Sequence, residues 1–273
     1  MPDGAARRCH DLRILVRMPS TPPTALVTGA TSGIGLELAH QLAERGHGLV
    51  LLARDPARLD EVADRLRTAY GVPVEMLPAD LGDPADLARA EARLADPERP
   101  VDLLLNNAGY GLRERFLDND AATEQRMLDV LVTAVLRLSH AALGAMVPRG
   151  RGGIINVSSV ASFLPRGTYS AAKAWVNSFS RWAHHEYGPA GVRVMTLCPG
   201  FVKTDFHARM DVGRDSAPAW MWLEPAPLVR EALADFDRGR AESIPSRRYR
   251  AIVTVTRLLP TGLLQRAQSL GRK

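Results

Sequence analysis

The feature that most constrains this fold is an alternation of short apolar runs and helical patterns, repeated six times between residues 24 and 198. Apolar runs followed by segments with a 3.6-residue period are typical of buried parallel strands joined by helices. Such a chain folds into a parallel sheet with right-handed crossover helices on both faces. We therefore predict an α/β fold, a doubly wound parallel sheet of about seven strands in a single domain.

The composition allows such a fold. The chain has 273 residues, of which 46% are hydrophobic and 24% charged, enough for a sizeable buried core. No apolar run approaches the roughly 18 uninterrupted residues of a transmembrane helix, so none is expected. Strands are expected at 25–29, 48–54, 74–78, 101–105, 153–159, 192–198 and 242–245, and helices at 36–45, 56–70, 84–95, 121–146, around 169–173 and at 227–238.

The first strand runs directly into a glycine-rich turn, residues 29–35, which a helix follows. Glycines let the backbone approach a pyrophosphate, and the helix N-terminus offers unpaired N–H groups and the positive end of its dipole. This arrangement predicts a dinucleotide site, although an ordinary turn is the alternative. The candidate contacts are Gly29, Thr31, Ser32, Gly33, Ile34 and Gly35.

The second strand ends in Ala53 and Arg54. In dinucleotide folds an acidic residue near this point binds the 2′-hydroxyl of the adenine ribose, whereas an arginine suits a 2′-phosphate. We therefore predict NADP(H) as the cofactor rather than NAD(H). Alternatively, Arg54 only caps the strand or stacks on adenine.

Polar residues also follow the third and fourth strands, and these strand ends face the ligand crevice of an open parallel sheet. The Asp80 carboxylate could accept the adenine amino group, although a role as a helix N-cap or turn residue is the alternative. The amides after the fourth strand can reach a ribose, and small residues beyond them leave room for the cofactor. The candidates here are Asp80, Leu81, Asn106, Asn107, Ala108 and Gly109.

Tyr169 and Lys173 are four residues apart, so a helix places both side chains on one face. A tyrosine with its ordinary pKa near 10 is a poor acid or base at neutral pH. Lowering that pKa by roughly three units requires about 4 kcal/mol, which one positive charge about 4 Å away supplies at an effective dielectric constant near 20. The pair predicts a general acid/base; a chance pair on a solvated helix is the alternative.

These motifs, in this order, resemble the short-chain dehydrogenase/reductase family. The resemblance is carried by Thr28-Gly-Ala-Thr-Ser-Gly-Ile-Gly35, Asn106-Asn-Ala-Gly109, a serine before Tyr169-x-x-x-Lys173, and Pro199-Gly200. It covers about residues 24–205 and implies a Rossmann-like fold. It also implies reversible hydride transfer between the nicotinamide and a carbonyl or secondary alcohol.

The resemblance assigns roles within the site. Tyr169 would exchange a proton with the substrate oxygen, and Lys173 would bind the nicotinamide ribose and lower the tyrosine pKa. Ser159 would hold the substrate oxygen; it aligns better than Ser158, although the loop to Tyr169 is about three residues shorter than is common. The loop residues implied near the nicotinamide are Pro199, Gly200, Val202 and Thr204.

One position departs from the family pattern. Many members have an asparagine in the long helix that supports a proton relay to the lysine, and here Leu131 aligns with it. A leucine cannot hydrogen-bond, so either another group serves the relay or turnover is slow. This departure keeps open a non-catalytic NADP-binding scaffold or redox sensor as the alternative function.

The ends of the chain carry the positive charge. Residues 246–273 contribute +7 and residues 1–20 contribute +2, so the remainder carries −4 of the net +5, which argues against a nucleic-acid-binding core. We expect a flexible extension at 1–23, in which translation could start at Met18. The dehydrogenase domain is expected at 24–246, with a substrate lid at about 205–225. A basic amphipathic tail is expected at 247–273.

Partners and location follow from the same features. The tail is expected to pack as a helix on the domain or a partner subunit; the alternative is contact with an anionic membrane by an enzyme of lipid-like ketones. The two cysteines lie far apart, which favours a reducing cytoplasm over a disulfide framework. No spacing typical of a metal site is present. The family resemblance implies a homo-dimer or homo-tetramer that acts on a small carbonyl or alcohol.

Overall fold

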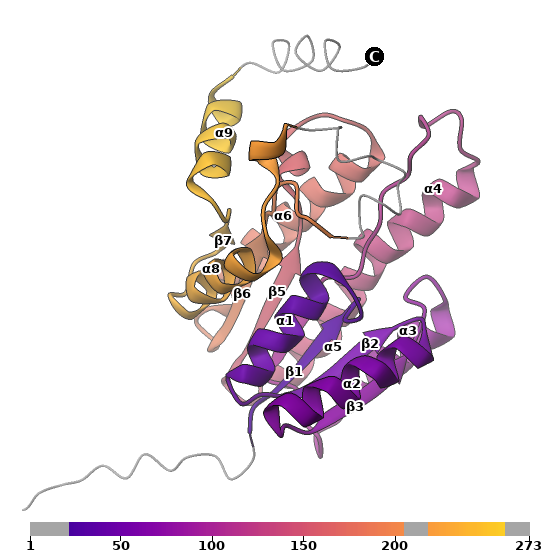
Figure 1. Cartoon of the computed structure of the whole chain (residues 1–273), viewed down its shortest axis with the longest axis vertical. Coiled ribbons are helices and arrows are strands. Elements are labelled where there is room, and N and C mark those ends of the chain that lie inside the picture. Colours follow the sequence, from indigo (N-terminus) through magenta and orange to yellow (C-terminus); the bar gives the residue numbers. More distant parts are fainter. Residues whose placement is uncertain (1–21, 205–217, 260–273) are drawn as a thin grey trace, which may run out of the picture.

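The computed structural model describes residues 22–204 and 218–259. Its centre is a seven-stranded sheet, parallel throughout, with the strand order β3-β2-β1-β4-β5-β6-β7 (Figure 1). This confirms the predicted doubly wound α/β fold. The strands are β1 (Thr24–Thr28), β2 (Gly48–Ala53), β3 (Val74–Pro78), β4 (Leu103–Asn106), β5 (Gly152–Val157), β6 (Val192–Leu197) and β7 (Glu242–Ser243).

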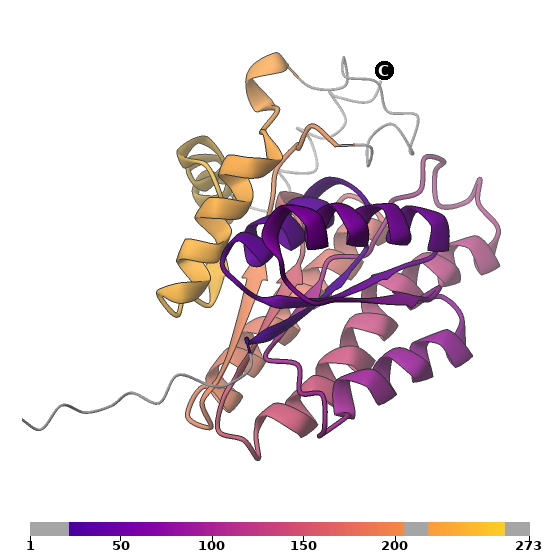
Figure 2. The same cartoon turned by 60° about the horizontal axis from the view of Figure 1, so that its bottom comes forward.

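Helices cover both faces of the sheet, and Figure 2 shows the two layers on either side of it. Aspartates cap three of them: the side chains of Asp55, Asp83 and Asp120 accept hydrogen bonds from first-turn N–H groups. A proline follows Asp55 and Asp83 at the first helical position. The helices are α1 (Gly33–Glu44), α2 (Pro56–Tyr70), α3 (Pro84–Ala95), α4 (Ala121–Leu128), η1 (Asp129–Thr133), α5 (Ala134–Met146), η2 (Val160–Phe163), α6 (Thr168–Tyr187), η4 (Ala219–Met221), α8 (Pro225–Asp237) and α9 (Arg247–Leu258).

The central strands β1, β2, β4 and β5 are buried on both sides and separate two apolar cores. Along β1, Val27 packs into the core beneath α1, α2 and α8, whereas Leu26 packs into the core beneath α3 and α5. Because successive side chains of a strand point to opposite faces, a strand between two helix layers must be apolar at nearly every position. This explains why the strands are continuous apolar runs in the sequence.

The long predicted helix at 121–146 is continuous but contains a π-helical turn, η1, between α4 and α5. By length and composition, Ala121–Met146 is the one helix in the described part of the chain that could cross a membrane. Half of its most apolar window is buried in this protein, however, and Leu138, Ala142 and Met146 pack into the second core. Its apolar character is therefore explained by its position against the sheet.

The order of the strands creates a crevice beside β1. The chain proceeds from β1 outward to β3, then returns to β4 on the other side of β1. The connections after β1 and β4 thus leave the sheet in opposite directions, and ligands of open α/β sheets bind at such a point, beyond the carboxyl ends of the strands.

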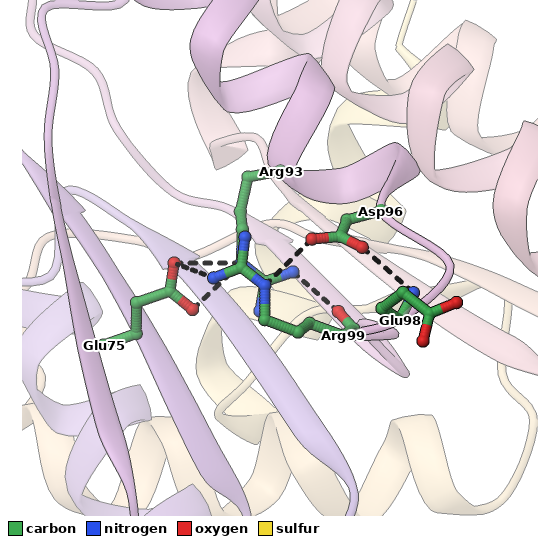
Figure 3. Close-up of polar contacts among 5 residues, drawn as sticks. All are labelled: Glu75, Arg93, Asp96, Glu98 and Arg99. Carbon is green, nitrogen blue, oxygen red and sulfur yellow. Dashed lines mark hydrogen bonds and ion pairs between the residues drawn. The ribbon is translucent and has the colours of Figure 1, made fainter.

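A charged cluster lies on the outer strand β3, near the amino end of that strand and away from the crevice (Figure 3). Glu75 pairs with the buried Arg93 at 2.9 Å and with Arg99 at 3.4 Å, and Arg99 also pairs with Asp96. Arg93 additionally donates to the Arg99 carbonyl, which fixes the loop after α3. Charge on an edge strand discourages pairing with another chain.

The C-terminal helix α9 packs on the domain. Tyr249 and Val253 are each 2% exposed and belong to the core beneath α1, α2 and α8. The first half of the predicted tail is therefore a packed helix, one of the two alternatives drawn from the sequence. The start at Met18, residues 205–217 of the predicted lid and residues 260–273 lie outside the described ranges.

Candidate active site

The glycine turn after β1 depends on the absence of side chains. Gly29 and Gly33 have φ angles of +65° and +56°, a region that favours glycine. A Cβ atom on Gly35 would lie 2.2 Å from the Gly29 carbonyl oxygen and 2.4 Å from Asn107 Nδ2. The turn therefore folds tightly onto the end of β4 and leads into the N-terminus of α1, where backbone N–H groups can bind an anion.

Hydrogen bonds lock this turn to the end of β4. The Thr28 hydroxyl oxygen accepts from the backbone N–H groups of Asn107 and Ala108, each at 2.9 Å. The Asn107 amide donates to the carbonyl oxygens of Thr28 at 2.9 Å and Gly29 at 3.3 Å. Asn107 thus positions the turn, which is the local role expected of an amide at this strand end.

Asn106 differs from its neighbour, and the structure corrects the prediction for its side chain. Its amide donates to Ser139 Oγ at 3.1 Å and to Asn156 Oδ1 at 2.8 Å, inside the core. Because side chains alternate along a strand, adjacent amides cannot both face the crevice. The side chains of Leu81 and Val202 are also buried, so only their backbones are left to contact a cofactor.

Asp80 and Arg54 lie at the ends of β3 and β2. One oxygen of Asp80 accepts from the Gly82 N–H at 2.9 Å, and the other pairs with Arg126 of α4 at 2.6 Å. The alternative role of Asp80 as a turn residue is thus present in the structure, and a contact with adenine stays a prediction. The Arg54 side chain is exposed immediately after β2.

Ser159, Tyr169 and Lys173 come together beside the ends of β5 and β6. The Ser159 side chain lies close enough to the Tyr169 hydroxyl to lower its pKa. Ser158 is buried and instead donates to the Lys173 carbonyl oxygen at 2.9 Å, so Ser159 is the serine that meets the tyrosine. Lys173 Nζ lies 5.9 Å from the centre of the Tyr169 ring and donates to the Val157 carbonyl oxygen at 2.7 Å.

Burial dominates the electrostatics of this pair. It raises the pKa of Tyr169 to about 12, although the hydrogen bond to Ser159 acts in the opposite direction. Burial also lowers the pKa of Lys173 to about 8. The polypeptide alone therefore shifts the tyrosine pKa upward, opposite to the predicted lowering by Lys173, because desolvation of the phenolate outweighs the effect of Ser159.

Comparison with known proteins agrees with this geometry. The model of the short chain dehydrogenase family matches residues 23–214. The chain belongs to this family. The very-long-chain 3-oxoacyl-CoA reductase of Anas platyrhynchos is 34% identical over 79% of this chain and 69% of its own length.

Two solved structures are similar over most of their length. A short-chain dehydrogenase from Sphingobium yanoikuyae in complex with NADPH is 38% identical, with a TM-score of 0.80 over 89% of this chain and 95% of that one. The bulky-bulky ketone specific alcohol dehydrogenase from Comamonas testosteroni is 33% identical, with a TM-score of 0.76 over 90% and 95% of the two chains. This short-chain dehydrogenase is therefore an oxidoreductase, and its family binds a nicotinamide cofactor.

Leu131 lies where this short-chain dehydrogenase departs from its family's pattern. It is fully buried in the π-helical turn, and a Cβ atom on Gly109 would lie 2.7 Å from Leu131 Cδ2 and 3.7 Å from Lys173 Nζ. The Leu131 side chain and the Lys173 ammonium group thus both lie against Gly109. With Met127 and Ala172, Leu131 forms a small apolar cluster beneath Tyr169.

Sequence reasoning missed the residues that hold the Ser159 loop. Asn177 follows Lys173 by four residues, so α6 presents it on the same face, and its amide donates to Ser162 Oγ at 2.6 Å. The Ser162 hydroxyl in turn donates to the Ser159 carbonyl oxygen at 2.5 Å. The same four-residue spacing that relates Tyr169 to Lys173 could have identified Asn177.

The loop Pro199–Thr204 returns from β6 to the glycine turn. A Cβ atom on Gly33 would lie 3.0 Å from the Thr204 Cβ, so the two segments are in contact. Val202 forms a bridge with Leu223, which is close to η4. The predicted cofactor loop therefore lies beside the turn that begins α1. Within residues 22–204 and 218–259, no group of three His, Cys, Asp or Glu could hold a metal ion.

Proposed function

We propose that this protein transfers a hydride reversibly between NADP(H) and a ketone or secondary alcohol, with Tyr169 as the general acid/base. The observation that carries the proposal is that Ser159 and Lys173 both lie beside Tyr169 at the crevice edge of the sheet, with the serine close enough to act on the pKa of the tyrosine hydroxyl. Two hydroxyl donors that converge on one point can hold a carbonyl oxygen and stabilise the charge that develops on it.

The residues around the crevice fit a dinucleotide. The glycine turn offers backbone N–H groups to a pyrophosphate, and the absent side chains at Gly29, Gly33 and Gly35 let it approach. The exposed Arg54 guanidinium would bind a 2′-phosphate, which supports NADP(H) over NAD(H). When bound, the cofactor supplies or accepts the hydride.

The protein's own groups would handle the proton. With a pKa of about 12, Tyr169 is protonated at neutral pH and can donate to the substrate oxygen in the reductive direction. With a pKa of about 8, Lys173 is mostly protonated there and favours the phenolate that remains. Ser159 would keep the oxygen in place as the second donor.

The substrate proposed is a bulky, apolar ketone or the corresponding alcohol. Tyr110, Leu112 and Tyr169 are partly buried and all pack against the apolar cluster of Leu131, which favours a substrate with an apolar body. The relative from Comamonas testosteroni is described as specific for bulky-bulky ketones, which agrees with this proposal.

The test is NADPH oxidation by purified protein over a panel of ketones of increasing size. We expect turnover of bulky aryl and alkyl ketones that the Tyr169→Phe variant loses, while that variant still binds NADPH. Binding of NADPH without turnover of any carbonyl would reject the enzymatic proposal.

A non-catalytic NADP-binding scaffold or redox sensor is the second candidate, because the buried Leu131 leaves no polar group on the long helix at the position beside Lys173. In that case NADP and NADPH would bind with different affinities and change the protein's oligomeric state or its binding to a partner. The ketone panel distinguishes the two candidates.

We also propose a cytoplasmic homo-dimer or homo-tetramer. Trp175 and Phe179 of α6 stack with 5.1 Å between ring centres, and the neighbouring Trp182 is 51% exposed. Apolar surface of this kind favours association with a second copy. Light scattering on the purified protein tests the assembly, and co-sedimentation with anionic liposomes tests the alternative of membrane contact through residues 247–273.

A further inference from the structure

Tyr249 of α9 lies against the loop that follows β6. Its side chain is 2% exposed. A Cβ atom on Gly200 would come within 2.0 to 2.4 Å of three atoms of the Tyr249 ring, so only glycine lets the loop lie directly on that ring. The C-terminal helix and the loop Pro199–Thr204 are therefore fitted to one another.

The Tyr249 hydroxyl joins two segments that are far apart in the sequence. It accepts a hydrogen bond from the Phe201 N–H at 3.0 Å and donates to the Met221 carbonyl oxygen at 2.8 Å. The same segments are paired next to this point, because Lys203 N donates to Leu223 O at 2.9 Å and Leu223 N donates to Phe201 O at 2.8 Å. One buried hydroxyl thus completes the attachment of the loop.

Helix α9 is itself held in place from several sides. Arg250 pairs with Glu231 of α8, and Arg257 pairs with Glu242 of β7 at 2.7 Å. The Arg257 guanidinium also lies 4.6 Å from the centre of the Phe163 ring, in η2, which follows Ser159. The helix therefore gives Tyr249 a fixed position from which to act on the loop.

We propose that Tyr249 is a positioning residue for the nicotinamide end of the cofactor site, and that α9 is part of the binding machinery. The inference rests on the proposed function and on the role that the family resemblance implies for the loop Pro199–Thr204, contact with the nicotinamide. Without the hydroxyl, the Phe201 N–H loses its partner and the loop adopts other conformations. Only one of these loop conformations can bind the cofactor, so the apparent affinity for NADPH falls.

The test compares Tyr249→Phe with wild type for two ligands. NADPH reaches the nicotinamide end, whereas adenosine 2′,5′-bisphosphate contains only the adenine end. We expect the Kd of NADPH to rise about tenfold, equivalent to about 1.4 kcal/mol, and the Kd of the bisphosphate to change less than twofold. Phenylalanine keeps the ring against Gly200, and Tyr70→Phe, which removes an exposed hydroxyl bonded to His40 on α1, is the matched control.

Hydrogen exchange gives a readout that does not depend on the cofactor. The Phe201 amide should exchange faster in Tyr249→Phe, whereas amides of β5 should not change. Unchanged NADPH affinity and unchanged exchange at Phe201 would reject the inference, and so would equal weakening of both ligands, which indicates a general loss of stability. Failure of wild type to bind NADPH would reject the proposed function and this inference together.

Discussion

The two ends of the crevice are built in different ways. At the end proposed to hold the pyrophosphate and adenine, called the adenine end below, the turn after β1 is shaped by backbone contacts that only glycine allows, and Asn107 ties it to β4. At the nicotinamide end, the loops are held by side chains from distant segments: Asn177 through Ser162, and Tyr249 through Phe201. Cofactor binding at the glycine turn should therefore be weakened by side-chain atoms added there. At the nicotinamide end it should be weakened by the loss of hydrogen bonds.

The largest effect is expected at the nicotinamide end from Tyr169→Phe. Because the variant lacks the proposed acid, kcat should fall about 10³-fold, within the range usual for general acid–base catalysis. The adenine end is unaltered, so the Kd of NADPH should stay within about twofold. Steady-state kinetics and fluorescence titration measure both values. Tyr187→Phe, on the same helix, should keep full activity, and a Tyr169→Phe variant that also keeps it would reject the assigned role.

At the adenine end the strongest disruption should come from Gly35→Ala. Its Cβ atom would lie 2.2 Å from the Gly29 carbonyl oxygen, so the turn must open. We expect a loss of about 1–3 kcal/mol in the free energy of unfolding and much weaker NADPH binding, measured by urea denaturation and titration. Gly144→Ala is the control, because no atom lies within 4 Å of that Cβ position. Equal stability of the two variants would contradict a turn shaped by close contact.

Arg54→Ala should affect one ligand and not the other. Loss of charge-assisted hydrogen bonds to the 2′-phosphate costs about 1.5–3 kcal/mol, so NADPH should bind roughly 10- to 100-fold more weakly. NADH, which lacks that phosphate, should bind as before. Arg58→Ala, on the exposed side of α2, controls for the loss of surface charge. Equal weakening of both cofactors would remove the basis for preferring NADP(H).

The smallest effect is a dependence of stability on pH. The pKa of Lys173 is lowered from 10.5 to about 8, so between these values the unfolded chain binds more protons than the folded chain. The Lys173 contribution to the free energy of unfolding should then rise with pH, from pH 8 to 10, by roughly 1 kcal/mol per unit. Above pH 10 the raised pKa of Tyr169 acts with the opposite sign.

Urea denaturation of wild type and Lys173→Met at several pH values measures this contribution as a difference. As the pH rises from 8 to 10, the free energy of unfolding of wild type should increase relative to that of Lys173→Met. If the two free energies of unfolding instead change in parallel with pH, the Lys173 ammonium group is not desolvated.

The same contrast explains what could be predicted from the sequence. The alternation of strands and helices, the glycine turn and the four-residue spacing of Tyr169 and Lys173 depend on residues close together in the chain, so the sequence alone predicts them. The direction of the Asn106 amide could not be predicted in this way, because its hydrogen-bond partners, Ser139 and Asn156, are distant in the sequence.

Contacts between distant segments leave no local pattern. The role of Tyr249 depends on Gly200, 49 residues earlier. The direction of the tyrosine pKa was missed for a related reason, because desolvation is set by the whole fold and not by the nearest charge.

The π-helical turn at Asp129–Thr133 has a consequence for the length of the long helix. Such a turn holds one more residue than an α-helix needs, so α4 and α5 are out of phase by about 100° of rotation. Removing one residue from it would restore a regular helix. In a regular helix, α4 could no longer support Tyr169 while α5 keeps its apolar face on the sheet. Single-residue deletions there should abolish folding or activity.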